Sequence, residues 1–149
     1  MLATSSGDGI GVREEIMLAA TEVAFSPLDL DPSEWASVCA HRPNVLIEGP
    51  VEATLAVLRR LQPHMGEPAI WQAANTPFEL PSGEAQTLIL EDVAALTRAN
   101  QVQLLARLDR REPRTQVVST SEHALFGLVT RGLFDAALYY RLNVVVVRV

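Results

Sequence analysis

From position 44 onwards, short apolar runs alternate with stretches in which apolar residues recur at the spacing of a helix. The apolar runs predict five strands, at 44–47, 69–71, 87–90, 116–120 and 142–149. The periodic stretches between them predict helices at 51–61, 101–111, 123–129 and 134–140. Because the strand runs lack a polar face, they are typical of a parallel sheet with helices on both sides. The sequence therefore predicts an α/β fold in three layers.

The amino-terminal part of the chain is less regular. Small and polar residues at 1–11 predict a flexible N-terminal tail, and helical spacing predicts a helix over 12–25. Asp31 and Pro32 are typical of the N-cap and the first position of a second, short helix. With 149 residues the chain has room for one domain with a full core, which we place at residues 12–149.

All twelve basic residues are arginine, and this excludes chemistry that needs lysine. Schiff-base formation and the phosphate-binding lysine of a P-loop are both ruled out. Eighteen acidic residues give a net charge of −6, which argues against DNA binding by charge. The single cysteine, Cys39, excludes an intramolecular disulfide, and no histidines are spaced as metal ligands. No apolar stretch approaches the roughly 20 residues of a membrane helix, so a cytoplasmic protein with no membrane contact is expected.

Two segments carry a family pattern. One reads QTLILEDVAAL followed by QLLARL, within residues 86–108, and the other reads GLFDAALYYRLNV, at residues 132–144. Both resemble the AAA+ domain of sigma-54-dependent transcription activators, the bacterial enhancer-binding proteins, which read GTLFLDEIGEL and G.FR.DLYYRLNV there. Residues 45–49 are similar to the strand before that family's P-loop, so the likeness covers 40–149 in the family's order. The resemblance implies a P-loop NTPase-like core with a parallel sheet of about five strands, and ATP with Mg²⁺ as cofactor.

The positions of the P-loop are altered in this chain. Gly49 stands at the first glycine and is followed by Pro50. Glu52 and Thr54 replace glycines, and Leu55 replaces the lysine. The Glu52 carboxylate would repel a phosphate, and Leu55 carries no charge that could neutralise one. Pro50 as the first helical residue and Glu52 at the positive end of the helix dipole are instead typical of an ordinary helix N-terminus. We therefore predict a degenerate nucleotide site with no cofactor, where ATP and Mg²⁺ are implied by the resemblance only.

The acidic pair after the third strand is Glu91-Asp92, the reverse of the family's Walker B order. In the family the aspartate faces Mg²⁺ and the glutamate faces the attacking water. Two interpretations remain here: a weak cation site at the end of the strand, or a solvated acidic turn that starts the next helix. After the fourth strand, Ser121 corresponds to the family's sensor asparagine. It can bind a water molecule or cap a helix that begins at Glu122.

The motif GLFDAALYYRLNV keeps one of the family's two arginines. The first is replaced by Asp135, and the second is Arg141. The family uses these arginines in trans, towards the γ-phosphate held by a neighbouring subunit. Arg141 therefore has two interpretations, an arginine finger or an ion pair at an interface or core edge.

Other arginines gather at the end of the helix predicted at 101–111, at positions Arg107, Arg110, Arg111 and Arg114. They form either a patch for an anion or partner, or a set of cations that stabilises a helix C-terminus. The valine run 144–147 belongs to a strand that should lie at a sheet edge. Because an uncovered edge can pair with another chain, self-association or a protein partner is expected on this side.

Two features of the family are missing. The connection at 71–87 is too short for the loop with the GAFTGA motif that contacts the sigma factor. The sequence reaches Val149 without the family's helical lid or helix-turn-helix domain, so we expect no second sensor arginine and no direct DNA binding in this domain. The sequence resembles a shortened, degenerate version of the domain.

These features predict a non-catalytic regulatory module that acts in transcription regulation or signalling through protein–protein contacts. Its partner is expected to be a sigma-54 activator, a signalling protein or a second copy. No residue is expected to be catalytic or to bind a metal, and the degenerate motifs argue against ATPase activity. A second hypothesis is a sensor that binds ATP or ADP weakly, without hydrolysis, through Gly49 and Glu91. A third is a receiver-like phospho-acceptor that uses Glu91 and Asp92, which the absence of lysine opposes.

Overall fold

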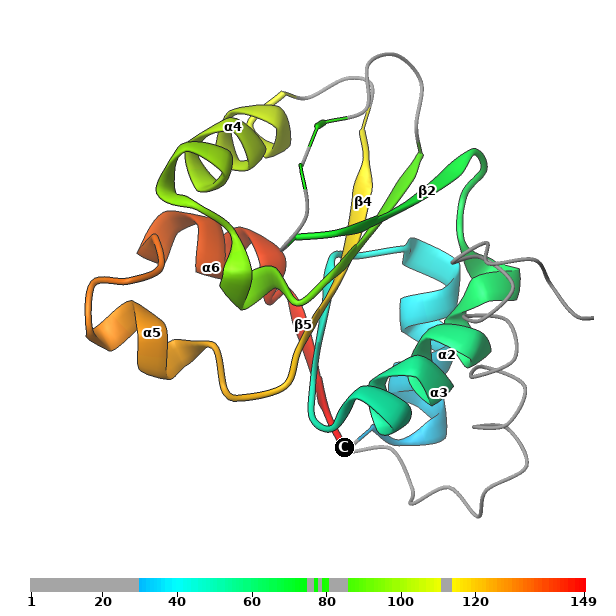
Figure 1. The fold of residues 1–149 in the computed structure, drawn as a ribbon. Helices are drawn as coiled ribbons and strands as arrows, with labels where there is room; N and C mark the ends of the chain where they lie inside the picture. Colours follow the sequence, from blue (N-terminus) through cyan, green and yellow to red (C-terminus); the bar gives the residue numbers. More distant parts are fainter. Residues whose placement is uncertain (1–29, 75–76, 78, 81–85, 111–113) are drawn as a thin grey trace, which may run out of the picture.

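The computed structural model describes residues 30–74, 77, 79–80, 86–110 and 114–149 (Figure 1). The tail predicted at 1–11 and the helix predicted at 12–25 lie outside these residues. The strands are β1 (Val45–Glu48), β2 (Ala69–Ala73), β3 (Thr87–Glu91), β4 (Gln116–Ser121) and β5 (Val145–Arg148). The α-helices are α2 (Pro32–His41), α3 (Val51–Leu61), α4 (Arg98–Leu108), α5 (Phe126–Thr130) and α6 (Ala136–Leu142). Two short 3₁₀ helices are η1 (Gln62–His64) and η2 (Val93–Ala95).

The strands form one sheet in the order β2-β3-β4-β1-β5, and every neighbouring pair is parallel. β1 lies between β4 and β5, so that Val45 is aligned with Val118 on one side and Val145 on the other. Parallel strands need crossover connections, and helices lie in those from β1 to β2, from β3 to β4 and from β4 to β5. The predicted α/β class is confirmed, and the last strand lies at a sheet edge as expected.

Helices cover both faces of the sheet. Ile47 on β1 packs in one core cluster with Leu55 of α3. Its neighbour Leu46 belongs to the other cluster, together with Leu104 of α4 and Leu138 of α6. Figure 1 shows the same division, with α2 and α3 on one face and α4, α5 and α6 on the other. The three predicted layers are therefore present.

Several predicted boundaries are wrong by two or three residues, and capping explains most of these shifts. The strand predicted at 142–149 begins only at Val145, because α6 continues through the fully buried Leu142. α6 itself begins after Asp135, later than predicted, because this side chain accepts the hydrogen bond that caps the helix. α4 begins earlier than predicted because Thr97 caps it in the same way.

The start of α2 agrees with its prediction. The Asp31 carboxylate accepts hydrogen bonds from the N–H groups of Ser33 and Glu34. In return, the Glu34 carboxylate accepts from the N–H of Asp31, which completes a capping box. Pro32 is the first helical residue, where its missing N–H costs no hydrogen bond.

Candidate functional site

The C-terminal ends of β3, β4 and β1 bring together three residues that the sequence predicts for a nucleotide site. Gly49 follows β1, Ser121 ends β4 and Asp92 follows β3. The N–H of Gly49 donates to the carbonyl of Ser121 at 2.9 Å, and the N–H of Asp92 donates to the Thr120 hydroxyl at 3.1 Å. Because the strands are parallel, these ends share one edge of the sheet, where α/β proteins place ligand sites. We refer to it as the C-terminal edge.

The connection from β1 to α3 consists of Gly49 and Pro50, where a P-loop has a longer glycine-rich cradle. Pro50 is the N-cap of α3, one position before its prediction as the first helical residue. Glu52 lies exposed in the first turn, near the positive end of the helix dipole, as predicted. The helix α3 therefore begins at positions that belong to the phosphate-binding loop in a P-loop.

The next two P-loop positions lie inside α3. The N–H of Thr54 donates to the carbonyl of Pro50 at 3.0 Å, and its hydroxyl donates to the carbonyl of Val51 at 2.9 Å. Leu55, at the lysine position, is 3% exposed and belongs to the core beside the sheet. In a P-loop, backbone N–H groups point at the phosphate and the lysine reaches it. Here the helix uses the N–H of Thr54, and the side chain at the lysine position faces the core.

Gly49 has no space for a side chain. Its φ of +151° is a conformation that few residues other than glycine adopt. A Cβ atom at this position would lie 2.3 Å from the carbonyl oxygen of Val149. The N–H of Val149 donates to the carbonyl of Glu48 at 3.0 Å, so the strand pairing continues past β5. Val149 thus packs directly against the first glycine of the P-loop-like turn.

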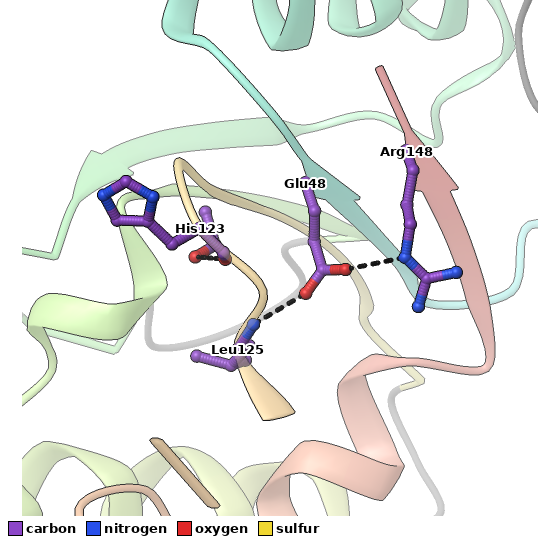
Figure 2. Close-up of polar contacts among 5 residues, drawn as sticks. Glu48, His123, Leu125 and Arg148 are labelled. Carbon is purple, nitrogen blue, oxygen red and sulfur yellow. Dashed lines mark hydrogen bonds and ion pairs between the residues drawn. The ribbon is translucent and has the colours of Figure 1, made fainter. Parts of the chain in front are cut away.

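Glu48 is a buried carboxylate at this edge that the sequence analysis did not single out. One oxygen accepts a hydrogen bond from the N–H of Leu125 at 2.7 Å, and the other lies 3.2 Å from Nε of Arg148. Figure 2 shows the Glu48 carboxyl group between these two donors. The Glu48 side chain is only 7% exposed, whereas Arg148 is 63% exposed. A carboxylate directly after a fully apolar strand run was the available signal, because a buried charge requires partners.

Ser121 does not cap a helix at Glu122, so the capping interpretation of this residue is wrong. Its hydroxyl donates to the carbonyl of His123 at 2.6 Å, and α5 begins three residues further on, at Phe126. The serine thus fixes the turn after β4 rather than a helix start. This turn leads to Leu125, whose N–H binds Glu48.

The first member of the acidic pair, Glu91 at the end of β3, binds a residue of β2. Strand β2 lies on the opposite side of β3 from β1 and its P-loop-like turn. The Glu91 carboxylate accepts a hydrogen bond from the indole N–H of Trp71 on β2, at 2.7 Å. Asp92 is exposed and has a left-handed backbone conformation, with φ of 57°, before η2. Among the described residues, no group of three or more histidine, cysteine or acidic side chains is placed to hold a metal ion. The two carboxylates therefore lie in different surroundings.

Arg141 lies far from this edge in the fold. Its guanidinium forms an ion pair with Asp109 at 2.6 Å, and both side chains are about half exposed (52% and 53%). Its carbonyl accepts a hydrogen bond from the side chain of Asn44, which directly precedes β1. The residue therefore lies at the N-terminal end of the sheet, so the chain does not bring Arg141 together with Gly49 or Glu91.

Two further features bear on function. Burial raises the pKa of the Cys39 thiol, which lies on α2, and this lowers the fraction of reactive thiolate. Within the described part of the chain, every helix is too short or too polar to cross a membrane.

The sheet order, the P-loop-like turn after β1 and the acidic pair after β3 define a P-loop NTPase-like α/β domain of the AAA+ type. Residues 53–149 match the family model of the sigma-54 interaction domain. The chain belongs to this family. No curated protein matches it.

Solved structures agree with this fold. NtrX from Brucella abortus is 21% identical over 94% of this chain, with a TM-score of 0.55, and the chain spans 40% of its length. The same protein in complex with ADP is 18% identical, covers 100% of this chain and 36% of its own, and has a TM-score of 0.53. The P-loop NTPase domain of the sigma-54 transport activator from E. coli is 18% identical over 80% of this chain and 96% of its own, with a TM-score of 0.53. Identities this low establish the fold alone.

Proposed function

We propose that this chain is a regulatory module of sigma-54-dependent transcription that does not hydrolyse ATP and acts through protein–protein contacts. The observation that carries the proposal is the start of α3. Because the helix begins at Val51, the N–H of Thr54 and the side chain of Leu55 are used by the helix and the core. Nothing at these positions is left to hold and neutralise a phosphate.

Three neighbouring contacts support the same proposal. The Glu48 carboxylate places a negative charge beside the P-loop-like turn, and it is bound by Leu125 and Arg148. Gly49 packs against Val149 on the side where a Cβ atom would lie, and its N–H is already bound to the carbonyl of Ser121. A nucleotide with its Mg²⁺ needs positive charge and open backbone at this edge.

The alternative function is a sensor that binds ATP or ADP weakly without hydrolysis. It is favoured by the related structures of NtrX from Brucella abortus in complex with ADP and with ATP. Both functions share the sigma-54 activator fold and differ in whether the C-terminal edge admits a nucleotide.

Trp71 offers a local reporter for this question. The chain has two tryptophans, so Trp35→Phe leaves Trp71 as the single tryptophan, which is excited selectively over the two tyrosines. Its indole N–H binds Glu91, so a nucleotide with Mg²⁺ at the acidic pair must disturb this contact. We expect no change in Trp71 emission up to millimolar Mg-ATP or Mg-ADP, and no phosphate release. A saturable change at micromolar nucleotide would establish the sensor instead. Glu91→Ala in the same background, which removes the acceptor of the indole N–H, is the control that shows the probe responds.

The proposed protein contact is tested with an intact sigma-54 activator. Its ATPase rate is measured with increasing amounts of this domain. We expect a saturable change in the ATPase rate, because a module with the same fold can dock on the AAA+ subunits of the activator. An unchanged rate, with no co-migration in sedimentation, contradicts this docking.

A further inference from the structure

An open hollow of about 730 Å³ lies at the N-terminal end of the sheet, at the opposite end of the strands from Gly49. Its walls come from α4, from α6 and from the residues before β1 and β4. The charged side chains that line it are Arg107, Arg110, Arg114, Arg141 and Asp109. Among the described residues, the lining thus contains four arginines and one aspartate, in a chain whose net charge is −6.

The four arginines reach the hollow from separate parts of the sequence. Arg107 lies in the last turn of α4, Arg114 just before β4, and Arg141 on α6. Stabilisation of the C-terminus of α4 accounts for the arginines at the end of that helix. It does not account for Arg141, which lies on α6. Asp109 pairs with Arg141 and offsets part of the charge, and arginines still outnumber acidic residues among the described residues of the lining. The clustering raises the local affinity for anions.

The size and chemistry of the hollow favour a small ligand with several negative charges. Its volume is in the range of small-molecule sites, about 300–1,000 Å³. Guanidinium groups bind phosphate in a two-pronged geometry, and several of them suit linked phosphates. The lining also includes two exposed apolar side chains, Tyr140 (63% exposed) and Val144 (62% exposed). An aromatic ring next to arginines is a surface on which a flat organic group can stack.

We propose that this arginine hollow binds an oligophosphate, either inorganic or carried by a small organic molecule. The phosphates lie among Arg110, Arg114 and Arg141, and an organic group contacts Tyr140. The site belongs to a single chain and lies away from the P-loop-like turn. It therefore does not depend on whether the C-terminal edge admits a nucleotide.

The test is calorimetric titration with inorganic triphosphate and, separately, with ATP, both in EDTA so that no Mg²⁺ is present. The probe variant is Arg110→Gln/Arg141→Gln. The matched control is Arg59→Gln/Arg131→Gln, which removes the same charge at two exposed arginines outside the hollow. Melting curves establish that both variants fold. Saturable binding that weakens about tenfold or more in the probe variant, and less than about twofold in the control, supports the proposal.

A gain of affinity supplies a second readout. Asp109→Asn removes the carboxylate of the hollow, and we expect triphosphate to bind about threefold or more tightly as a result. Equal weakening in probe and control variants, or no binding at millimolar triphosphate, overturns the proposal.

The comparison of ligands distinguishes the two sources of phosphate. If ATP binds more tightly than triphosphate, and if Tyr140→Ala removes this difference in affinity, the hollow is assigned to an organic phosphate. Equal affinity assigns it to an inorganic one. Binding in the hollow leaves Trp71 emission unchanged, so its failure and the failure of the proposed function are separate results.

Discussion

The Glu48 carboxylate on β1 accepts a hydrogen bond of 2.7 Å from the backbone N–H of Leu125, which lies 77 positions further along the chain. Its second oxygen binds Arg148 at the end of β5. One buried side chain therefore joins β1, β5 and the turn that leads into α5 (Figure 2). The same carboxylate directly precedes the P-loop-like turn at Gly49, so the contacts that hold this edge together place a carboxylate, paired with Arg148, beside that turn.

The Glu48 contacts predict a graded loss of stability. Glu48→Ala leaves the buried N–H of Leu125 without its acceptor, so it should lower the free energy of unfolding by about 1–3 kcal/mol. Glu48→Gln keeps an amide oxygen for Leu125 and loses the charge towards the exposed Arg148, so it should cost less. Urea unfolding of the three proteins measures the order. Equal stability of all three would show that the contact contributes nothing.

The contact between Gly49 and Val149 predicts that Gly49→Ala destabilises the fold by about 2 kcal/mol or more, because φ and space are both unfavourable. Gly127, inside α5, is the matched control, since a Cβ there meets nothing within 4 Å. Gly127→Ala should be neutral or stabilise by up to about 1 kcal/mol. Thermal unfolding of both variants provides the comparison. Similar melting temperatures for both would contradict the close packing at Gly49.

Most of the fold is predictable because strands buried on both faces read as apolar runs, as Val45–Glu48 and Thr87–Glu91 do. The boundaries are harder, because they depend on which polar residue caps a helix. Thr97 and Asp135 are ordinary capping residues, but apolar periodicity places the helices α4 and α6 two or three positions away from them. Caps should therefore be weighed before periodicity when helix starts are predicted.

The candidate site is predictable only in part. The altered residues Glu52 and Leu55 can be read from a motif, since each stands at a fixed place in the P-loop pattern. Glu48 cannot be assigned a role in this way, because its partners lie 77 and 100 positions away and meet it only through the sheet order. The distance of Arg141 from Gly49 is likewise a property of the folded chain.

The Asp31 cap of α2 predicts that the stability of this helix depends on pH in the acidic range. Hydrogen bonds from the Ser33 side chain and the Glu34 N–H hold the pKa of Asp31 below its usual value in the folded chain. A lowered pKa means that the cap stabilises α2 above the ordinary carboxylate range and is lost as the pH falls through the folded value. NMR shifts of the Ser33 and Glu34 amides should follow this titration. They should lose it in Asp31→Asn, which caps without a charge, and a persisting titration there would exclude Asp31 as its source.

The two arginine positions of the GLFDAALYYRLNV motif predict different effects on stability. Arg141→Gln breaks an ion pair between half-exposed groups and should cost less than about 1 kcal/mol. Asp135→Arg restores the family's arginine but removes the acceptor for the Leu138 N–H, so it should cost about 1 kcal/mol. Asp135→Asn, which can still cap, is the control and should stay near the parent. Urea unfolding of all three variants gives the values, and an Asp135→Arg protein as stable as the parent would mean that the cap is dispensable.

The core position of Leu55 predicts that the P-loop lysine cannot be restored by a single substitution. Leu55 is 3% exposed and packs beside the sheet, so Leu55→Lys should lower the free energy of unfolding by about 3 kcal/mol or more and create no Mg-ATP binding. Glu52→Lys places the same charge at an exposed position of the first turn and should cost only about 0.3–1 kcal/mol, from the helix dipole. Unfolding curves and the Trp71 emission titration are measured on both variants. Mg-ATP binding by a stably folded Leu55→Lys protein would mean that α3 can open at its first turn, and that the shortened connection after β1 does not by itself prevent nucleotide binding.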